Sequence, residues 1–105
     1  TLGWLPDGFE LSSKTASSMY VYTTFVNKDG ASIVFEQCAG SDIEIFLDSE
    51  HNQYRTIFEN GIDISLYDYK NNHIAIWAQD GYVFQLTCYA DVSQETILNI
   101  IFNTV

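Results

Sequence analysis

Positive charge is scarce in this sequence of 105 residues. Only four lysines and arginines stand against 14 aspartates and glutamates, which gives a formal net charge of -10 at pH 7. A surface of this sign repels phosphate backbones and anionic lipid headgroups, so nucleic-acid binding and direct membrane insertion are disfavoured. The acidic residues are scattered and form no tail, which is typical of a solubilising surface.

Apolar runs of membrane-spanning length are missing, and so is a signal peptide. The chain begins at Thr1 without an initiator methionine, so we expect a fragment of a longer protein, and a membrane anchor upstream of it would not be visible in this sequence. The length of the chain, with 47% hydrophobic and 15% aromatic residues, predicts a single packed, strand-rich domain over residues 1–105. Such a domain folds without a metal or disulfide staple.

Cysteines are few, and their spacing fits neither a metal site nor a redox pair. Cys38 and Cys88 are the two in the chain. Two alternatives stay open. Outside the cell they could form one bridge, closing a loop of about 50 residues and adding about 4 kcal/mol to stability. We expect instead two reduced, buried thiols on separate faces of the sheet.

Catalytic motifs are missing as well. The sequence has no nucleophile elbow, phosphate-cradling glycine loop, dinucleotide-binding fingerprint or zinc-protease motif. Its two histidines, His51 and His73, fall at the edges of expected turns, where a solvated histidine is the ordinary outcome. We therefore expect no enzyme activity, no catalytic residues and no cofactor.

One acidic strand face is a candidate metal site. Carboxylate oxygens suit calcium, but alternate residues of a strand lie about 7 Å apart, too far for several of them to converge on one ion. We therefore expect a solvated face and no metal. Its four residues are Asp42, Glu44, Asp48 and Glu50.

What the sequence does contain is short alternating apolar runs joined by turn dipeptides. Asn60-Gly61 and Asp80-Gly81 favour the type I′ turn, in which both central residues have positive φ. With a further two-residue turn at Asn71-Asn72, they predict a four-strand antiparallel meander over residues 54–89. Its shared apolar face is expected to pair Ile57 with Ile64, Leu66 with Trp77, and Trp77 with Phe84.

The remaining elements complete an α+β fold. Asp29-Gly30 predicts another two-residue hairpin, which would pair Val26 with Ile33 and Phe25 with Val34. Residues 14–18 are expected to form a loop and residues 43–47 a strand. Ser93 is a plausible N-cap for a short C-terminal helix. We expect a curled antiparallel β-meander of about seven to eight strands with that helix packed on it.

Tyrosines gather on the other face of the expected meander. Their apolar rings and polar tips are enriched in interfaces, although tyrosine is also an ordinary residue on a half-exposed sheet. Both readings stay open. The four residues of this candidate interaction surface are Tyr54, Tyr67, Tyr69 and Tyr89.

Three segments resemble a known family in order and spacing. WLPDGFEL is similar to an LPEGYEL opening, SIVFEQ to an I-x-F-x-Q strand, and IAIWAQDGYVFQLTCYADVSQETILNI to an L-x-W-x-x-x-G-Y-x-Y-x-L…S-x-E-E-L-x-K-I ending. Together they resemble the domain-of-unknown-function family 4367. The chain departs from the pattern at Thr96, where the family has glutamate, and in its two cysteines. The structural positions that the resemblance carries over are Pro6, Gly8, Trp77, Gly81, Tyr82 and Ser93.

The resemblance also implies a setting and a function. The family is found mainly in Firmicutes, which are Gram-positive, and its domain commonly follows a transmembrane helix and lies outside the cell, sometimes in anti-sigma-factor-like proteins. No catalytic residues are recognised for it. We therefore expect a non-enzymatic sensing or interaction domain on the extracellular face of the membrane. The alternative is a carrier of an apolar ligand such as a lipid or lipopeptide, by architectural analogy with lipoprotein carriers.

Overall fold

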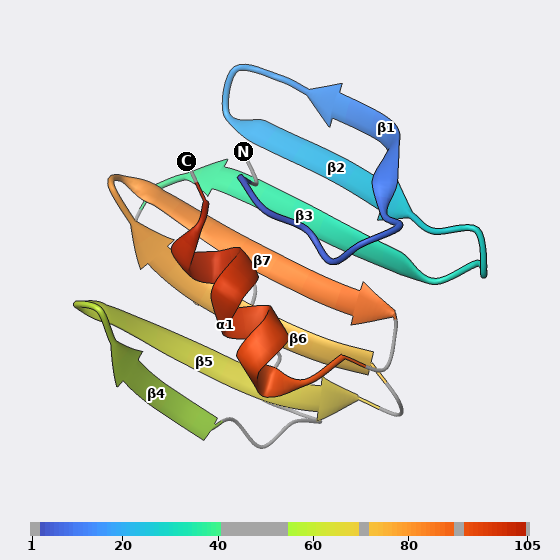
Figure 1. Cartoon of the computed structure of the whole chain (residues 1–105). Helices are drawn as coiled ribbons and strands as arrows, with labels where there is room; N and C mark the ends of the chain where they lie inside the picture. The colour runs from blue at the N-terminus through green and yellow to red at the C-terminus, as the bar shows by residue number, and fades with distance from the viewer. Residues whose placement is uncertain (1–2, 41–54, 70–71, 90–91, 105) are drawn as a thin grey trace.

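A computed structural model describes residues 3–40, 55–69, 72–89 and 92–104. Within these ranges the chain forms one open sheet of seven antiparallel strands and a single C-terminal helix, which confirms the α+β meander (Figure 1). The expected strand at residues 43–47 lies outside the described residues. The elements are β1 (Glu10–Ala16), β2 (Tyr20–Val26), β3 (Ser32–Ala39), β4 (Arg55–Glu59), β5 (Ile62–Tyr69), β6 (Asn72–Gln79), β7 (Tyr82–Tyr89) and α1 (Gln94–Phe102).

The strand order is β1-β2-β3-β7-β6-β5-β4. Two consecutive meanders are therefore joined side by side, with β3 paired to β7 in the middle and β1 and β4 at the two ends of the described strand order. The central strands carry the buried residues, whereas every residue of β1 is exposed. An open sheet of this kind needs a cover on its apolar face, and α1 supplies part of it.

Two of the hairpins have the turns that the sequence predicts. Positive φ angles of 51° at Asn60, 77° at Gly61, 54° at Asp80 and 84° at Gly81 are those of type I′ turns. The pairings of Ile57 with Ile64 and of Trp77 with Phe84 are confirmed.

The hairpin between β5 and β6 differs by two residues from the prediction. Leu66 pairs with Ala75, and Trp77 pairs with Ile64. The cause is that Asn72 belongs to β6, where it pairs with Tyr69, and is not part of the turn. A shift of two residues leaves every side chain on its expected face, because the side-chain period of a strand is two.

The hairpin between β2 and β3 differs by one residue, which has a larger effect. Phe25 pairs with Ile33 rather than with Val34. The Asn27 side-chain oxygen accepts hydrogen bonds from the N–H groups of Asp29 and Ala31, both at 3.0 Å, and so closes a three-residue loop. The expected faces of β2 and β3 were therefore wrong, since a one-residue slip moves Phe25 onto the face of Ile33.

The N-terminal part contains a turn and one further correction. Phe9 N–H donates to Pro6 O at 3.4 Å, so Pro6 holds the first position of this turn, and Gly8, at its third position, has a positive φ of 90°. The loop expected at residues 14–18 is wrong for its first three residues, because Lys14–Ala16 continue β1. Pairing to β2 supplies the backbone hydrogen bonds that this polar segment needs.

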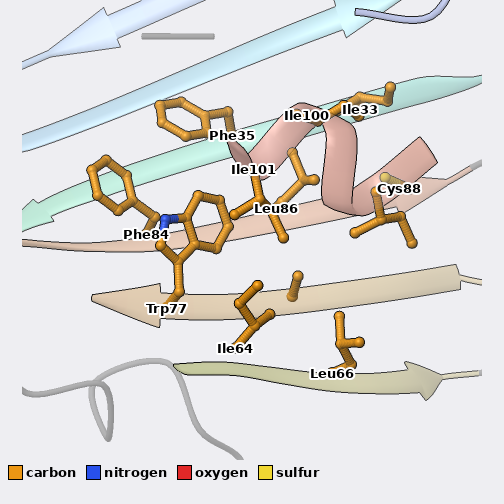
Figure 2. Close-up of a cluster of buried hydrophobic side chains, with 12 residues drawn as sticks. Ile33, Phe35, Ile64, Leu66, Trp77, Phe84, Leu86, Cys88, Ile100 and Ile101 are labelled. Atoms are coloured by element: carbon orange, nitrogen blue, oxygen red, sulfur yellow. The ribbon is translucent and has the colours of Figure 1, made fainter. Parts of the chain in front are cut away.

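Helix α1 packs on one face of the sheet, called the helix face below. Ser93 is the N-cap, and its Oγ accepts from the Thr96 N–H at 3.1 Å. The buried stripe of the helix is Ile97, Ile100 and Ile101, and Figure 2 shows the last two beside Leu86. Burial of each isoleucine side chain contributes about 1.5–3 kcal/mol to the stability of the fold.

The two ends of the chain meet at this cover. The Gly3 N–H donates to the carbonyl oxygen of Asn103, just after α1, at 2.8 Å. Leu5 and Phe9 then pack against the core on the helix face. The segment before β1 and the helix together cover the central strands.

Candidate binding groove

The apolar helix face extends beyond the area that α1 covers. Helix α1 lies across β6 and β7, whereas no helix of the described residues lies in front of β1 and β2 (Figure 1). A groove of about 250 Å³ occupies part of this uncovered area. It is lined by Leu11, Lys14, Val21, Thr23, Phe25, Phe35 and Gln37.

A β-bulge decides which side chains of β1 reach the groove. Leu11 pairs with Phe25, but Ser13 pairs with Thr24, so one extra residue enters β1 between these two pairs. Lys14 then pairs with Thr23 and joins Leu11 on the helix face, although residues three apart in a regular strand point to opposite faces. The bulge therefore places an ammonium group beside an apolar surface.

The floor of the groove is formed by buried side chains, and its rim is exposed. Phe35 is 2% exposed and Thr23 is 6% exposed, whereas Leu11 at the edge is 61% exposed. The Phe35 ring stacks on Phe84 at a centroid distance of 5.6 Å, and Phe84 stacks on Trp77 at 5.2 Å (Figure 2). This aromatic row connects the floor of the groove with the centre of the core.

A smaller hollow of about 140 Å³ adjoins the groove at the turn between β1 and β2. It shares Val21 and Gln37 with the groove, and Tyr82 also lines it. Met19 is 63% exposed and Tyr82 is 42% exposed at this end. Exposed apolar side chains thus continue past the groove itself, as is common on binding surfaces.

A larger hollow of about 580 Å³ runs along the outer side of α1. Its lining contains two carboxylates, Glu59 and Glu95, with Trp4, Leu98 and Phe102 as its large apolar members. The other lining residues are polar, so this hollow lacks the continuous apolar floor that favours an apolar ligand.

The arrangement most like a catalytic site is a row across three strands. Asp68, His73 and Cys88 occupy directly paired positions on β5, β6 and β7. His73 Nδ1 lies 2.7 Å from Asp68 Oδ1, and Arg55 Nη1 lies 3.5 Å from Asp68 Oδ2. The hydrogen bond with His73 lowers the pKa of Asp68, and the charges of His73 and Arg55 add to the effect.

Cys88 is unsuited to act as a nucleophile. Its side chain is 0% exposed, and burial raises the pKa of the thiol to about 12. Catalysis by cysteine needs the thiolate and access for a substrate. The Asp68–His73 pair therefore orients no reactive group and is a polar contact at the rim of the sheet.

The opposite face of the sheet contains a polar network. Tyr20 Oη donates to Glu36 Oε2 at 2.6 Å, and Gln85 Nε2 donates to Glu36 Oε1 at 3.2 Å. Burial, followed by the hydrogen bond to Glu36, raises the pKa of Tyr20. These bonds give both oxygens of the half-buried Glu36 carboxylate a hydrogen-bond donor. The network therefore has a structural role and needs no functional one to explain it.

The tyrosine surface is only partly described. Tyr67 is 6% exposed and packs with Ile76 and Val83, whereas Tyr89 is 50% exposed. Tyr54 and the side chain of Tyr69 lie outside the described residues. An interaction role for these four tyrosines stays a prediction, and of the two described rings only Tyr89 offers a large exposed area.

Several residues expected to have structural roles lie in the core, in a turn or at the helix cap. Trp77 is 0% exposed and Phe84 is 6% exposed, Gly81 completes its turn, and Ser93 caps α1. Within the described ranges, no three His, Cys, Asp or Glu side chains gather closely enough to hold a metal ion. The acidic candidate at Asp42–Glu50 lies outside those ranges.

Sequence reasoning missed the groove. The uncovered area depends on the bulge in β1 and on the β2–β3 register, and neither the bulge nor that register was predicted. A signal was present in Asn27, whose side-chain oxygen favours a three-residue loop that includes Asp29-Gly30.

Comparisons with known proteins show the family of the chain. Among the described helices, none is long and apolar enough to cross a membrane. No curated protein and no solved structure matches the chain. The model of a family described as a domain of unknown function, DUF4367, matches residues 1–103. The chain therefore belongs to the DUF4367 family.

Proposed function

We propose that this domain is a non-enzymatic sensing or interaction module on the extracellular face of the membrane, within an anchored, anti-sigma-factor-like protein. The observation that carries the binding role is the uncovered groove, with Leu11 exposed at its rim and Phe35 buried at its floor. Exposed apolar surface next to a buried aromatic side chain is typical of binding sites.

The proposed location is supported by family membership and by the charge of the chain. The DUF4367 match covers residues 1–103, and the resemblance implies a domain displayed beyond a transmembrane helix. A net charge of -10 keeps such a domain soluble beside an anionic membrane surface.

Protease treatment of cells that express the full-length protein tests the location. With an epitope tag on the domain, protease added to intact cells should remove the tag, while a cytoplasmic control protein stays whole. Protection of the tag in intact cells, with digestion only after lysis, would contradict the extracellular assignment.

A second candidate function is binding of an apolar ligand such as a lipid or lipopeptide, and it is favoured by the same groove. The space directly beneath α1 is filled, because Ile33, Leu86 and Ile100 are each 0% exposed. A ligand would therefore bind beside the helix, over β1 to β3. Displacement of a fluorescent fatty acid tests this candidate, and the absence of saturable binding at micromolar protein would contradict it.

A further inference from the structure

We propose that the groove over β1, β2 and β3 binds one alkyl chain that carries an anionic head, with Lys14 pairing with the head. This inference rests on the second candidate function and specifies its ligand. Its basis is the charge and size of the groove.

The charge of the groove is opposite to that of the protein. Acidic side chains outnumber basic ones 14 to four in the chain, yet among the described residues the groove is lined by Lys14 and by no carboxylate. The two acidic residues of β1, β2 and β3 lie on the other face of the sheet. Glu10 pairs with Val26 and Glu36 pairs with Tyr22, and both pairs lie on the face opposite the helix.

The ammonium group is also uncommitted. Among the described residues the ion pairs join Asp68 to Arg55 and His73, and none involves Lys14. An unpaired cation at the rim of an apolar groove complements a ligand with an apolar tail and a carboxylate or phosphate head. Neutral and cationic amphiphiles lack that partner.

The size of the groove favours a single chain. Its volume of about 250 Å³ exceeds the roughly 150 Å³ of an apolar cavity that admits benzene. It is below the roughly 300 Å³ at which pockets for drug-sized ligands begin. One alkyl chain of medium length fits this range.

The test is a titration of the ¹⁵N-labelled domain, followed by amide chemical shifts, with decanoate, 1-decanol and decyltrimethylammonium. We expect saturable shifts on β1 to β3, with decanoate binding about fivefold tighter than decanol, as an exposed ion pair allows. Lys14→Gln should remove that preference and leave decanol binding unchanged. Lys28→Gln, which removes an exposed charge from the β2–β3 loop, is the matched control and should keep it.

Two results would overturn the inference in different ways. Equal binding of decanoate and decanol, unchanged by Lys14→Gln, would reject the anionic head but leave the apolar-ligand function standing. Failure of both decanoate and decanol to produce saturable shifts on β1 to β3 would reject the groove as an alkyl site, and the apolar-ligand function with it. The protease test of location is independent of both results.

Discussion

Cys38 and Cys88 lie on opposite faces of the same sheet. Cys38 pairs with Val83, on the face away from α1, whereas Cys88 pairs with Ile33 beneath the helix. Both thiols are free, Cys38 being half-buried and Cys88 buried. The intervening sheet keeps their sulfur atoms from the short approach that a disulfide needs.

Thiol titration should therefore find two reactive groups per denatured, non-reduced chain. In the folded protein Cys38 should react first, because burial removes access to Cys88 and raises the pKa of its thiol to about 12. The variants Cys38→Ser and Cys88→Ser assign the two rates. A denatured monomer with no reactive thiol would contradict the open sheet.

Trp77→Ala should cost about 3–5 kcal/mol of unfolding free energy, because it removes a fully buried ring stacked on Phe84. Trp77→Phe should cost less. Trp77 Nε1 is buried without a hydrogen-bond partner among the described residues, so the phenylalanine removes an unsatisfied donor along with part of the volume. Urea unfolding measures both values.

Trp4→Phe is the control for the Trp77 variants, since Trp4 is 37% exposed. It should change the unfolding free energy by about 0.5 kcal/mol or less. A loss under about 1 kcal/mol for Trp77→Ala would show that the aromatic row is not central to stability.

Asp68→Asn should reduce the loss of stability at acid pH. The hydrogen bond from His73 lowers the folded-state pKa of Asp68 below its unfolded value of about 3.9. Its contribution is therefore complete above that unfolded value and is lost as the pH falls through the lower folded pKa. Urea unfolding from pH 6 downward measures the slope in the wild type and the variant.

His73→Ala is the matched test of the cause. Removing either partner removes the same hydrogen bond, so the double variant should be less destabilised than the sum of the single ones. Fully additive effects, together with an unchanged acid slope in Asp68→Asn, would mean that the pair contributes nothing to stability.

Ser93→Ala should destabilise the protein by about 1 kcal/mol, because the Thr96 N–H loses the side-chain oxygen that accepts its hydrogen bond. Ser93→Asp keeps an acceptor near the positive end of α1 and should stay close to the wild type. Equal losses in the two variants, measured by thermal unfolding, would assign Ser93 a role other than capping.

The sequence was most informative where a turn is decided by its own two residues. Asn60-Gly61 and Asp80-Gly81 fixed the outer pairings of the meander, because few other residue pairs accept positive φ at both positions. Asp29-Gly30 was misleading, since the Asn27 side chain closes a loop one residue longer. That single residue decides which face of β2 meets the core.

The groove could not be predicted from local pattern alone. Lys14 and Thr15 are polar, and they form a strand because β2 lies beside them. No turn dipeptide or other local motif predicts the bulge between Leu11 and Ser13. The uncovered area also depends on where α1 lies, which is a property of the packed molecule.

The most direct test of the groove as the binding site compares Leu11→Asp with Phe58→Asp. Both replace an exposed apolar residue of an edge strand, 61% and 68% exposed, with one negative charge, but only Leu11 lines the groove. With a fluorescent fatty acid as the probe, Leu11→Asp should weaken binding about tenfold, the equivalent of roughly 1.4 kcal/mol, and Phe58→Asp less than about twofold. Equal affinities for the two folded variants, or no saturable binding by the wild type, would contradict the account.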